Sequence, residues 1–165
     1  MTRPSLKTQS LGLVGWLVAA CAAGGVGAIA SARAAAFYGQ LVQPSWAPPS
    51  WLFGPVWSVL YVSMAVAAWL VWRERGFRGA PVALGLFVLQ LVANALWTWL
   101  FFTFHLGAAA AAEIVLLWLL IAATISHFWP VSRVAALLLV PYLAWVGFAT
   151  ALTFSLWRLN PVVLG

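Results

Sequence analysis

The stretch AAAAAEIVLLWLLIAATISHF, which occupies residues 108–128, decides the fold class of this chain. Glu113 carries its only formal charge, and a helix needs about 20 apolar residues to cross the hydrocarbon core of a bilayer. Strands of a membrane barrel are shorter and alternate between apolar and polar residues. Because lipid cannot satisfy backbone polar groups, the stretch predicts a membrane-spanning α-helix.

Four other apolar stretches have a similar length and character. They predict further spanning helices at residues 11–32, 53–72, 81–104 and 134–156. The composition agrees, since 65% of the 165 residues are hydrophobic, 6% are charged and the mean hydropathy is +1.04. A soluble domain has about a quarter of its residues charged. We therefore predict an all-α membrane protein in which residues 1–165 form a single bundle of five transmembrane helices.

The first apolar stretch has two interpretations. Arg3 and Lys7, the apolar run that follows them and the small residues at 30–32 together resemble a secretory signal with its cleavage site. The apolar run is longer than the core of such a signal, and this length favours a retained helix.

Prolines predict irregular backbone at two places. Pro141 lies inside the fifth stretch, where its missing N–H predicts a kink. The first loop, residues 33–52, contains QPSWAPPSW at residues 43–51. Its indoles suit an anchor at the membrane interface, and its prolines also suit a semi-rigid lid over a cavity between helices.

The basic residues are scattered singly between apolar stretches, which excludes the basic stripe of a nucleic-acid-binding protein. Five helices divide them into two groups of six and two: Arg3, Lys7, Arg73, Arg75, Arg78 and Arg133 on one side, and Arg33 and Arg158 on the other. The five stretches predict a multi-pass protein. If its membrane is a bacterial inner membrane, the positive-inside rule places the amino end, which lies on the side with six basic residues, in the cytoplasm.

Residues for conventional catalysis are few. A single cysteine, Cys21, excludes an internal disulfide, and two acids, Glu74 and Glu113, lie too far apart along the chain for paired carboxylate chemistry. His105 and His127 have no ligand partners at metal-binding spacing, so we expect no metal site, with axial haem ligation as a minor alternative. We favour a structural role for Glu113 near a helix dipole and interfacial water over a functional one.

A polar face is predicted on the third helix. Gln90, Asn94 and Trp97 fall at i, i+4 and i+7 and therefore share one side. Amides facing lipid are costly, so this side should face the bundle interior. There it would serve equally well as hydrogen-bonding glue between helices or as a set of groups that orient a ligand.

Aromatic residues form further faces at the same spacing. The second helix offers Trp57, Tyr61, Met64 and Ala68, and the fifth offers Trp145, Ala149 and Leu152. Such stripes are typical of a core or of a lipid-facing surface. Three helices that each offer an indole beside small or polar neighbours would also suit a flat aromatic ligand, because ring stacking adds about 0.5–1.5 kcal/mol per contact.

Three blocks of the chain resemble the translocator protein family, also called tryptophan-rich sensory proteins or peripheral benzodiazepine receptors. The first block, residues 37–73, contains QPSWAPP at 43–49 and GPVW at 54–57. The second block runs from Gln90 to Phe102, and the third runs from PYLAW at 141–145 to Asn160. Their common order over nearly the whole chain is more specific than any single motif.

The resemblance implies a five-helix bundle, often a homodimer, that binds protoporphyrin IX and related tetrapyrroles, sterols or other lipids, and synthetic benzodiazepine-type and isoquinoline ligands. It implies no obligatory cofactor. The family pocket lies under the first loop and would be lined here by Trp46, Trp57, Tyr61, Asn94, Trp97, Trp145, Ala149 and Leu152. Gln90 would add a polar contact to the same ligand.

We expect a tetrapyrrole-binding sensor or regulator on this basis. The alternatives are light- and oxygen-dependent porphyrin degradation, with Trp57 and Trp145 as the participating indoles, and transport of porphyrin or lipid. Two positions depart from animal relatives. Ala109 stands where they have tryptophan, which reshapes the pocket, and Phe154 stands where the sterol motif has tyrosine, which argues against sterol recognition.

Overall fold

The computed structural model describes residues 5–165, and these residues form helices without any strand. Five segments are long and apolar enough to cross a membrane. The α-helices are α1 (Leu6–Ala30), α2 (Ala34–Gln40), α3 (Phe53–Gly79), α4 (Pro81–Thr98), α5 (Gly107–Phe128), α6 (Arg133–Leu138), α7 (Val140–Leu159) and α8 (Pro161–Leu164). A 3₁₀ turn, η1 (Ser50–Leu52), precedes α3, and a π-helical segment, η2 (Trp99–Thr103), extends α4.

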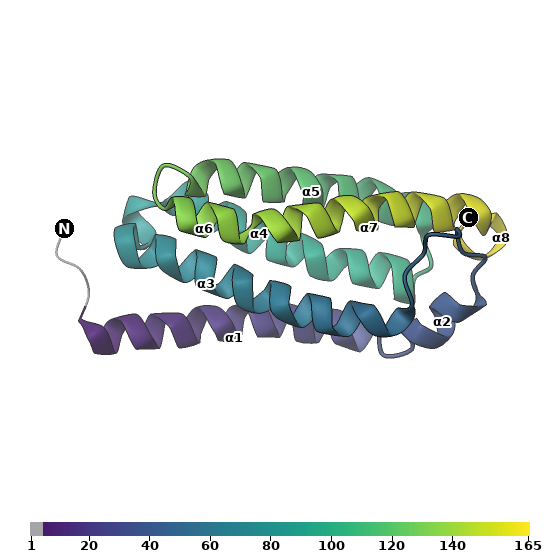
Figure 1. Cartoon of the computed structure of the whole chain (residues 1–165), viewed down its shortest axis with the longest axis horizontal. Coiled ribbons are helices and arrows are strands. Elements are labelled where there is room, and N and C mark those ends of the chain that lie inside the picture. The colour runs from purple at the N-terminus through teal and green to yellow at the C-terminus, as the bar shows by residue number, and fades with distance from the viewer. Residues whose placement is uncertain (1–4) are drawn as a thin grey trace.

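The long helices lie side by side along the longest axis of the molecule (Figure 1). Helix α5 packs against α4 and α7, and α1 packs against α3 and α4. The short helices α2 and α8 lie together at the end of the bundle where α1 finishes and α3 begins (Figure 1). The predicted all-α membrane bundle with five spanning segments is confirmed, and the chain is an integral multi-pass membrane protein.

Helix α1 packs into the bundle, as expected for a retained helix. The Trp16 ring meets the Phe87 ring of α4 edge to face, with centroids 5.5 Å apart. On α3, the Trp69 indole donates a hydrogen bond of 2.8 Å to the Gln9 carbonyl. Ala20 is fully buried. Helix α1 therefore packs against the bundle at Gln9, at Trp16 and at Ala20.

The second spanning helix is longer than its apolar stretch predicts. Helix α3 continues through Arg73 and Arg75 and is interrupted at Gly76, whose φ is +64°, before a last short helical piece that ends at Gly79. Charges end the apolar stretch without ending the helix, because charged side chains are well solvated beyond the hydrocarbon core. The left-handed φ at residue 76 suits glycine, which has no Cβ to clash there.

The kink predicted at Pro141 is present as a break between α6 and α7 at Leu139. Proline cannot donate the i→i−4 hydrogen bond of a regular helix. Near the break, the Ser63 hydroxyl of α3 donates a 2.7 Å hydrogen bond to the Leu138 carbonyl. A neighbouring helix thus satisfies exposed backbone at the irregular turn, as lipid-embedded proline breaks require.

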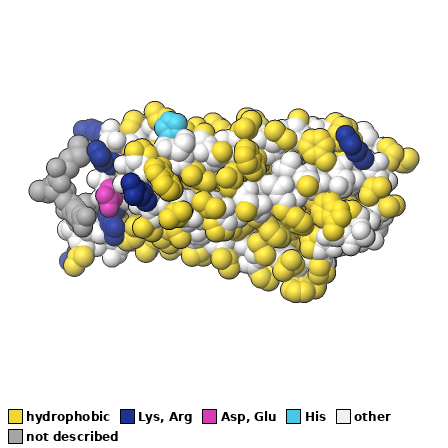
Figure 2. All heavy atoms as spheres, turned by 45° about the horizontal axis from the view of Figure 1, so that its top comes forward, with side chains coloured by type: hydrophobic (Ala, Val, Ile, Leu, Met, Phe, Trp, Pro, Cys, Tyr) yellow, Lys and Arg dark blue, Asp and Glu magenta, His cyan; other side chains and the backbone are white. Residues whose placement is uncertain are grey.

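Formal charges gather at the two ends of the bundle. Figure 2 shows a mostly hydrophobic surface, with most of the visible Lys and Arg side chains at the end where α1 begins. Lys7 lies in the first turns of α1, Arg78 at the end of α3 and Arg133 at the start of α6, whereas Arg33 and Arg158 belong to the opposite end. This division matches the predicted one, except that Arg3 lies outside the described residues.

Gly107→Ala tests how closely the start of α5 approaches the end of the chain. A Cβ on Gly107 would collide with the Trp157 indole and with the Leu164 carbonyl oxygen. Overpacking costs about 1–3 kcal/mol, so we expect this variant to unfold at a lower temperature, measured by circular dichroism in detergent. Gly85→Ala is the matched control, because a Cβ there meets nothing within 4 Å. Equal unfolding temperatures for the two variants would contradict this packing.

Candidate ligand-binding site

A continuous set of hydrogen bonds joins three spanning helices in the interior. The Tyr61 hydroxyl of α3 donates to Asn94 Oδ1 at 2.6 Å, and Asn94 Nδ2 donates to the Tyr142 hydroxyl of α7 at 3.0 Å. Tyr142 in turn donates to Gln90 Oε1 at 2.8 Å, and Gln90 Nε2 lies 3.9 Å from the Met64 sulfur. The predicted inward orientation of Gln90 and Asn94 is confirmed, since both are almost fully buried.

Tyr142 is the member of this set that the sequence reasoning missed. Its side chain is completely buried, and its hydroxyl contacts both amides of α4. A signal was available, because Tyr142 precedes Trp145 by three residues and Ala149 by seven, so all three share a helical face. The partnership itself depends on how α7 is set against α4, which spacing along one helix does not specify.

One indole, Trp57, packs against the network, and a second, Trp145, lies among other aromatic rings. The Trp57 ring lies 5.7 Å from the Tyr61 ring and 6.1 Å from the Tyr142 ring, measured between centroids. Trp145 contacts Phe53 and Phe148, with centroid distances of 5.9 and 5.4 Å. These indoles are partly buried and pack against the core, so the structure turns them toward the protein interior.

Trp97 lies closer to the end of the bundle that carries the first loop. Its ring stacks on Phe101 at 5.5 Å and meets Phe102 edge to face at 5.8 Å. Ala149 and Leu152 of α7 are buried, and Leu152 belongs to the same apolar cluster as Phe101. These predicted residues therefore face the interior, about one to three helical turns along their helices from the Asn94 network.

The first loop is held by a hydrogen bond within the loop and by hydrogen bonds to the end of α7. The Tyr38 hydroxyl donates to the Pro48 carbonyl at 3.1 Å, and burial raises the pKa of this phenol, which favours its protonated, donating form. Asn160, at the end of α7, pairs with both the N–H and the carbonyl of Val42 at 2.8 and 2.9 Å. Trp46 remains 47% exposed and contacts Phe148 of α7 at 5.8 Å.

Three buried side chains among residues 5–165 carry polar atoms without a hydrogen-bond partner. They are the indole N–H groups of Trp97 and Trp145 and both carboxylate oxygens of Glu113. Glu113 is only 8% exposed and lies beyond the first turn of α5. The expected contact of Glu113 with interfacial water is therefore wrong, because the face of α5 that carries it packs inside the bundle.

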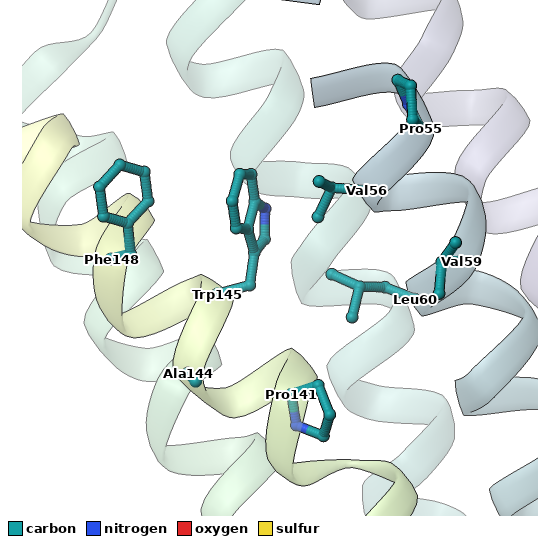
Figure 3. A pocket seen from close by; sticks show the side chains of 8 residues that line it. All are labelled: Pro55, Val56, Val59, Leu60, Pro141, Ala144, Trp145 and Phe148. Carbon is teal, nitrogen blue, oxygen red and sulfur yellow. The ribbon is translucent and has the colours of Figure 1, made fainter. Parts of the chain in front are cut away.

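A lateral cleft of about 650 Å³ opens between α3 and α7. Figure 3 shows Trp145 projecting from α7 toward Val56 of α3, with Pro141 and Ala144 below it. The other lining residues are Pro55, Val59, Leu60 and Phe148. Of the predicted ligand-binding residues, this cleft contains Trp145 alone, and the remaining ones lie around the network and under the loop.

The site combines a few polar groups with aromatic surroundings. The polar atoms of the site are amides, phenols and indole N–H groups, which orient ligands by hydrogen bonds. Among residues 5–165 there is no group of three or more His, Cys, Asp or Glu side chains able to hold a metal ion. The ligand-binding role of the predicted residues remains a prediction at this point.

Asn94→Leu tests the central position of the amide. The variant removes the acceptor of the Tyr61 hydroxyl and the donor to the Tyr142 hydroxyl, which keeps its bond to Gln90. An unpaired buried polar group costs about 1–3 kcal/mol. We expect unfolding at clearly lower denaturant concentration, followed by circular dichroism, and a smaller effect for Tyr61→Phe, which removes one bond. Ser155→Ala is the control, because that hydroxyl bonds the Ala151 carbonyl of its own helix at an exposed site. Similar midpoints for Asn94→Leu and the control would refute a stabilising network.

Comparison with known proteins agrees with this architecture. The sequence model of the TspO/MBR family matches residues 16–158. Protein CrtK of Rhodobacter capsulatus is 43% identical over 148 residues, which cover 88% of this chain and 91% of that protein. The translocator protein of Homo sapiens is 42% identical over 75% of each chain, and a tryptophan-rich sensory protein of Cereibacter sphaeroides is 40% identical over 75% of this chain and 77% of its own. The chain therefore belongs to the TspO/MBR family.

Proposed function

We propose that this protein is a membrane-embedded binding protein and sensor for tetrapyrroles of the protoporphyrin IX type. The observation that carries the proposal is the Tyr61–Asn94–Tyr142 network with the Trp57 ring packed against both tyrosines. A flat macrocycle gains from offset or edge-to-face contact with indoles. A few fixed polar groups in apolar surroundings then select its orientation.

The unpaired indole donors support an acceptor-bearing guest. The N–H groups of Trp97 and Trp145 are buried without an acceptor among residues 5–165, and unpaired buried donors are costly. The carboxylate side chains of protoporphyrin IX offer acceptors of the required kind. A sensory role also agrees with the name of the Cereibacter sphaeroides relative.

The lateral cleft supports entry of the ligand from the bilayer. Its lining is apolar, and its volume of about 650 Å³ lies within the roughly 300–1,000 Å³ of ligand pockets. At the loop end of the bundle, the first loop is tied to α7 through Val42 and Asn160. The side of the bundle is thus open at an apolar cleft, while the first loop is bonded to α7 at the end.

The distribution of basic residues supports an orientation with the amino end in the cytoplasm. Lys7, Arg73, Arg75, Arg78 and Arg133 lie at one end of the bundle. Basic residues in short loops are retained on the cytoplasmic side of a bacterial inner membrane. The first loop and α8 would then face the opposite compartment.

Trp57→Leu and Trp145→Leu test the stacking contacts. Each loses an aromatic contact of about 0.5–1.5 kcal/mol, so we expect protoporphyrin IX to bind about two- to tenfold more weakly, measured by titration of its Soret absorbance. Trp129→Leu is the matched control, because this indole is exposed between α5 and α6 at the other end of the bundle. Wild-type protein that does not change the porphyrin spectrum at micromolar concentration would refute the proposal.

Ala144→Phe tests entry through the cleft. Ala144 is exposed and lines the cleft beside Pro141, so an added ring fills the opening without displacing buried atoms. We expect slower association of protoporphyrin IX in stopped-flow measurements, by about tenfold or more, with a much smaller change in unfolding temperature. Ala112→Phe places the same ring on an exposed position of α5 and should leave the rate unchanged. Equal association rates for the two variants would exclude the cleft as the route.

A further inference from the structure

A second pocket, of about 430 Å³, lies at the loop end of the bundle and shares no lining residue with the lateral cleft. It is formed where the end of α1, the helix α2 and the segment after η2 meet. The polar residues that line it are Arg33, Gln40, Thr103 and His105. The apolar ones are Ile29, Ala30, Ala32, Ala36, Phe37 and Phe102.

The polar lining of this pocket favours an anionic group. Arg33 carries a permanent positive charge, and Gln40 and His105 add hydrogen-bonding nitrogen atoms. No carboxylate side chain lines the pocket. A guanidinium beside neutral donors, without a competing acid, is the arrangement that binds phosphate oxygens.

Ring contacts and a hydrogen bond fix the side of the pocket that contains His105. The imidazole stacks on the Phe37 ring, with centroids 4.3 Å apart and planes at 17°. Phe37 also meets Phe101 and Phe102 edge to face, at 6.2 and 6.3 Å. The Thr103 hydroxyl donates to the Ala30 carbonyl at 3.3 Å and so links η2 to the end of α1.

The backbone of His105 is also unusual. Its φ of +54° is the only positive φ of a non-glycine residue among residues 5–165. Such conformations are disfavoured for residues with a Cβ and concentrate at functional sites. The turn directs the chain from η2 into α5 and brings the imidazole against α2.

The position of the pocket favours a lipid over a soluble anion as its ligand. The spanning helices α1 and α4–η2 end beside it, so it lies at the depth of lipid head groups. Ile29, which is 68% exposed on α1, continues the apolar part of the lining toward the hydrocarbon core. A soluble phosphate would leave this apolar part uncovered, whereas a lipid would cover it with its glycerol and first acyl carbons.

We propose that the pocket formed by Arg33, Gln40 and His105 binds the head group of an anionic phospholipid. The phosphate accepts hydrogen bonds from Arg33 and its neighbours, and an acyl chain follows the apolar surface of α1 and η2. This pocket has a different lining from the lateral cleft, and the proposal does not depend on the function proposed above.

Native mass spectrometry of the full chain in detergent tests the proposal, with phosphatidylglycerol and phosphatidylcholine of identical acyl chains as probes. We expect wild type to bind phosphatidylglycerol about tenfold or more tightly than phosphatidylcholine, and Arg33→Gln to lose this preference. Arg158→Gln is the matched control, because Arg158 is exposed at the same end of the bundle, outside the pocket. It should retain the preference.

Three results would overturn the proposal: equal binding of the two lipids by wild type, an unchanged preference in Arg33→Gln, or equal losses in the two arginine variants. Displacement of the lipid by an equimolar amount of glycerol 3-phosphate would show a site for soluble phosphates and would also overturn it. An unfolding temperature of Arg33→Gln close to that of wild type, measured by circular dichroism, verifies that the variant is folded.

The variant His105→Asn tests the same proposal independently of Arg33. Asparagine tolerates the left-handed backbone conformation of this position, so the turn should persist while the stacked imidazole is lost. We expect the preference for phosphatidylglycerol to fall by about threefold or more, with an unfolding temperature close to that of wild type. A full preference in His105→Asn would exclude the imidazole from the site.

Discussion

A polar side chain inside a membrane helix must find its partners on other helices, and Asn94 meets this requirement between Tyr61 and Tyr142. This constraint sets α3, α4 and α7 in one rotational position relative to one another. Tyr142 also reaches Gln90, one turn away on the same helix as Asn94. The position of Trp57 follows, since its ring packs against both tyrosines. The proposed ligand site is therefore held by the same contacts that hold the bundle.

Openings in the bundle occur where the helices are irregular. The lateral cleft lies beside Pro141, just after the break at Leu139, and the second pocket lies beside the π-helical segment η2 and the strained turn at His105. Regular helices of small residues approach closely and leave little space, as the fully buried Ala65 and Ala68 of α3 illustrate. Changes of backbone direction separate neighbouring helices and create room for a guest.

The two proposed sites differ in the polarity of their surroundings. The indole site lies within the spanning region, where shape and ring contacts dominate and a few hydrogen bonds set orientation. The second pocket lies at the head-group depth, where charge and hydrogen bonding to phosphate dominate. The first loop contributes to both, because α2 lines the pocket while Trp46 contacts Phe148 of α7. Its hydrogen bonds to Asn160 connect these contributions to the end of α7.

The chain alone was sufficient to predict five spanning helices, because the thickness of the bilayer imposes a length that each apolar stretch displays. It also predicted that Gln90 and Asn94 face inward, since amides cannot face lipid. The predicted end of the second stretch at residue 72 is exceeded by the helical turn through Arg73 and Arg75, because charges near head groups do not end a helix, and the interruption comes at Gly76. The burial of Glu113 and the partners of Tyr142 were decided by how the helices pack together. In segments that are apolar on every side, periodicity does not distinguish the side that faces lipid from the side that lines a cleft. Val56 and Ala144 were therefore identified as cleft-lining residues only from the folded bundle.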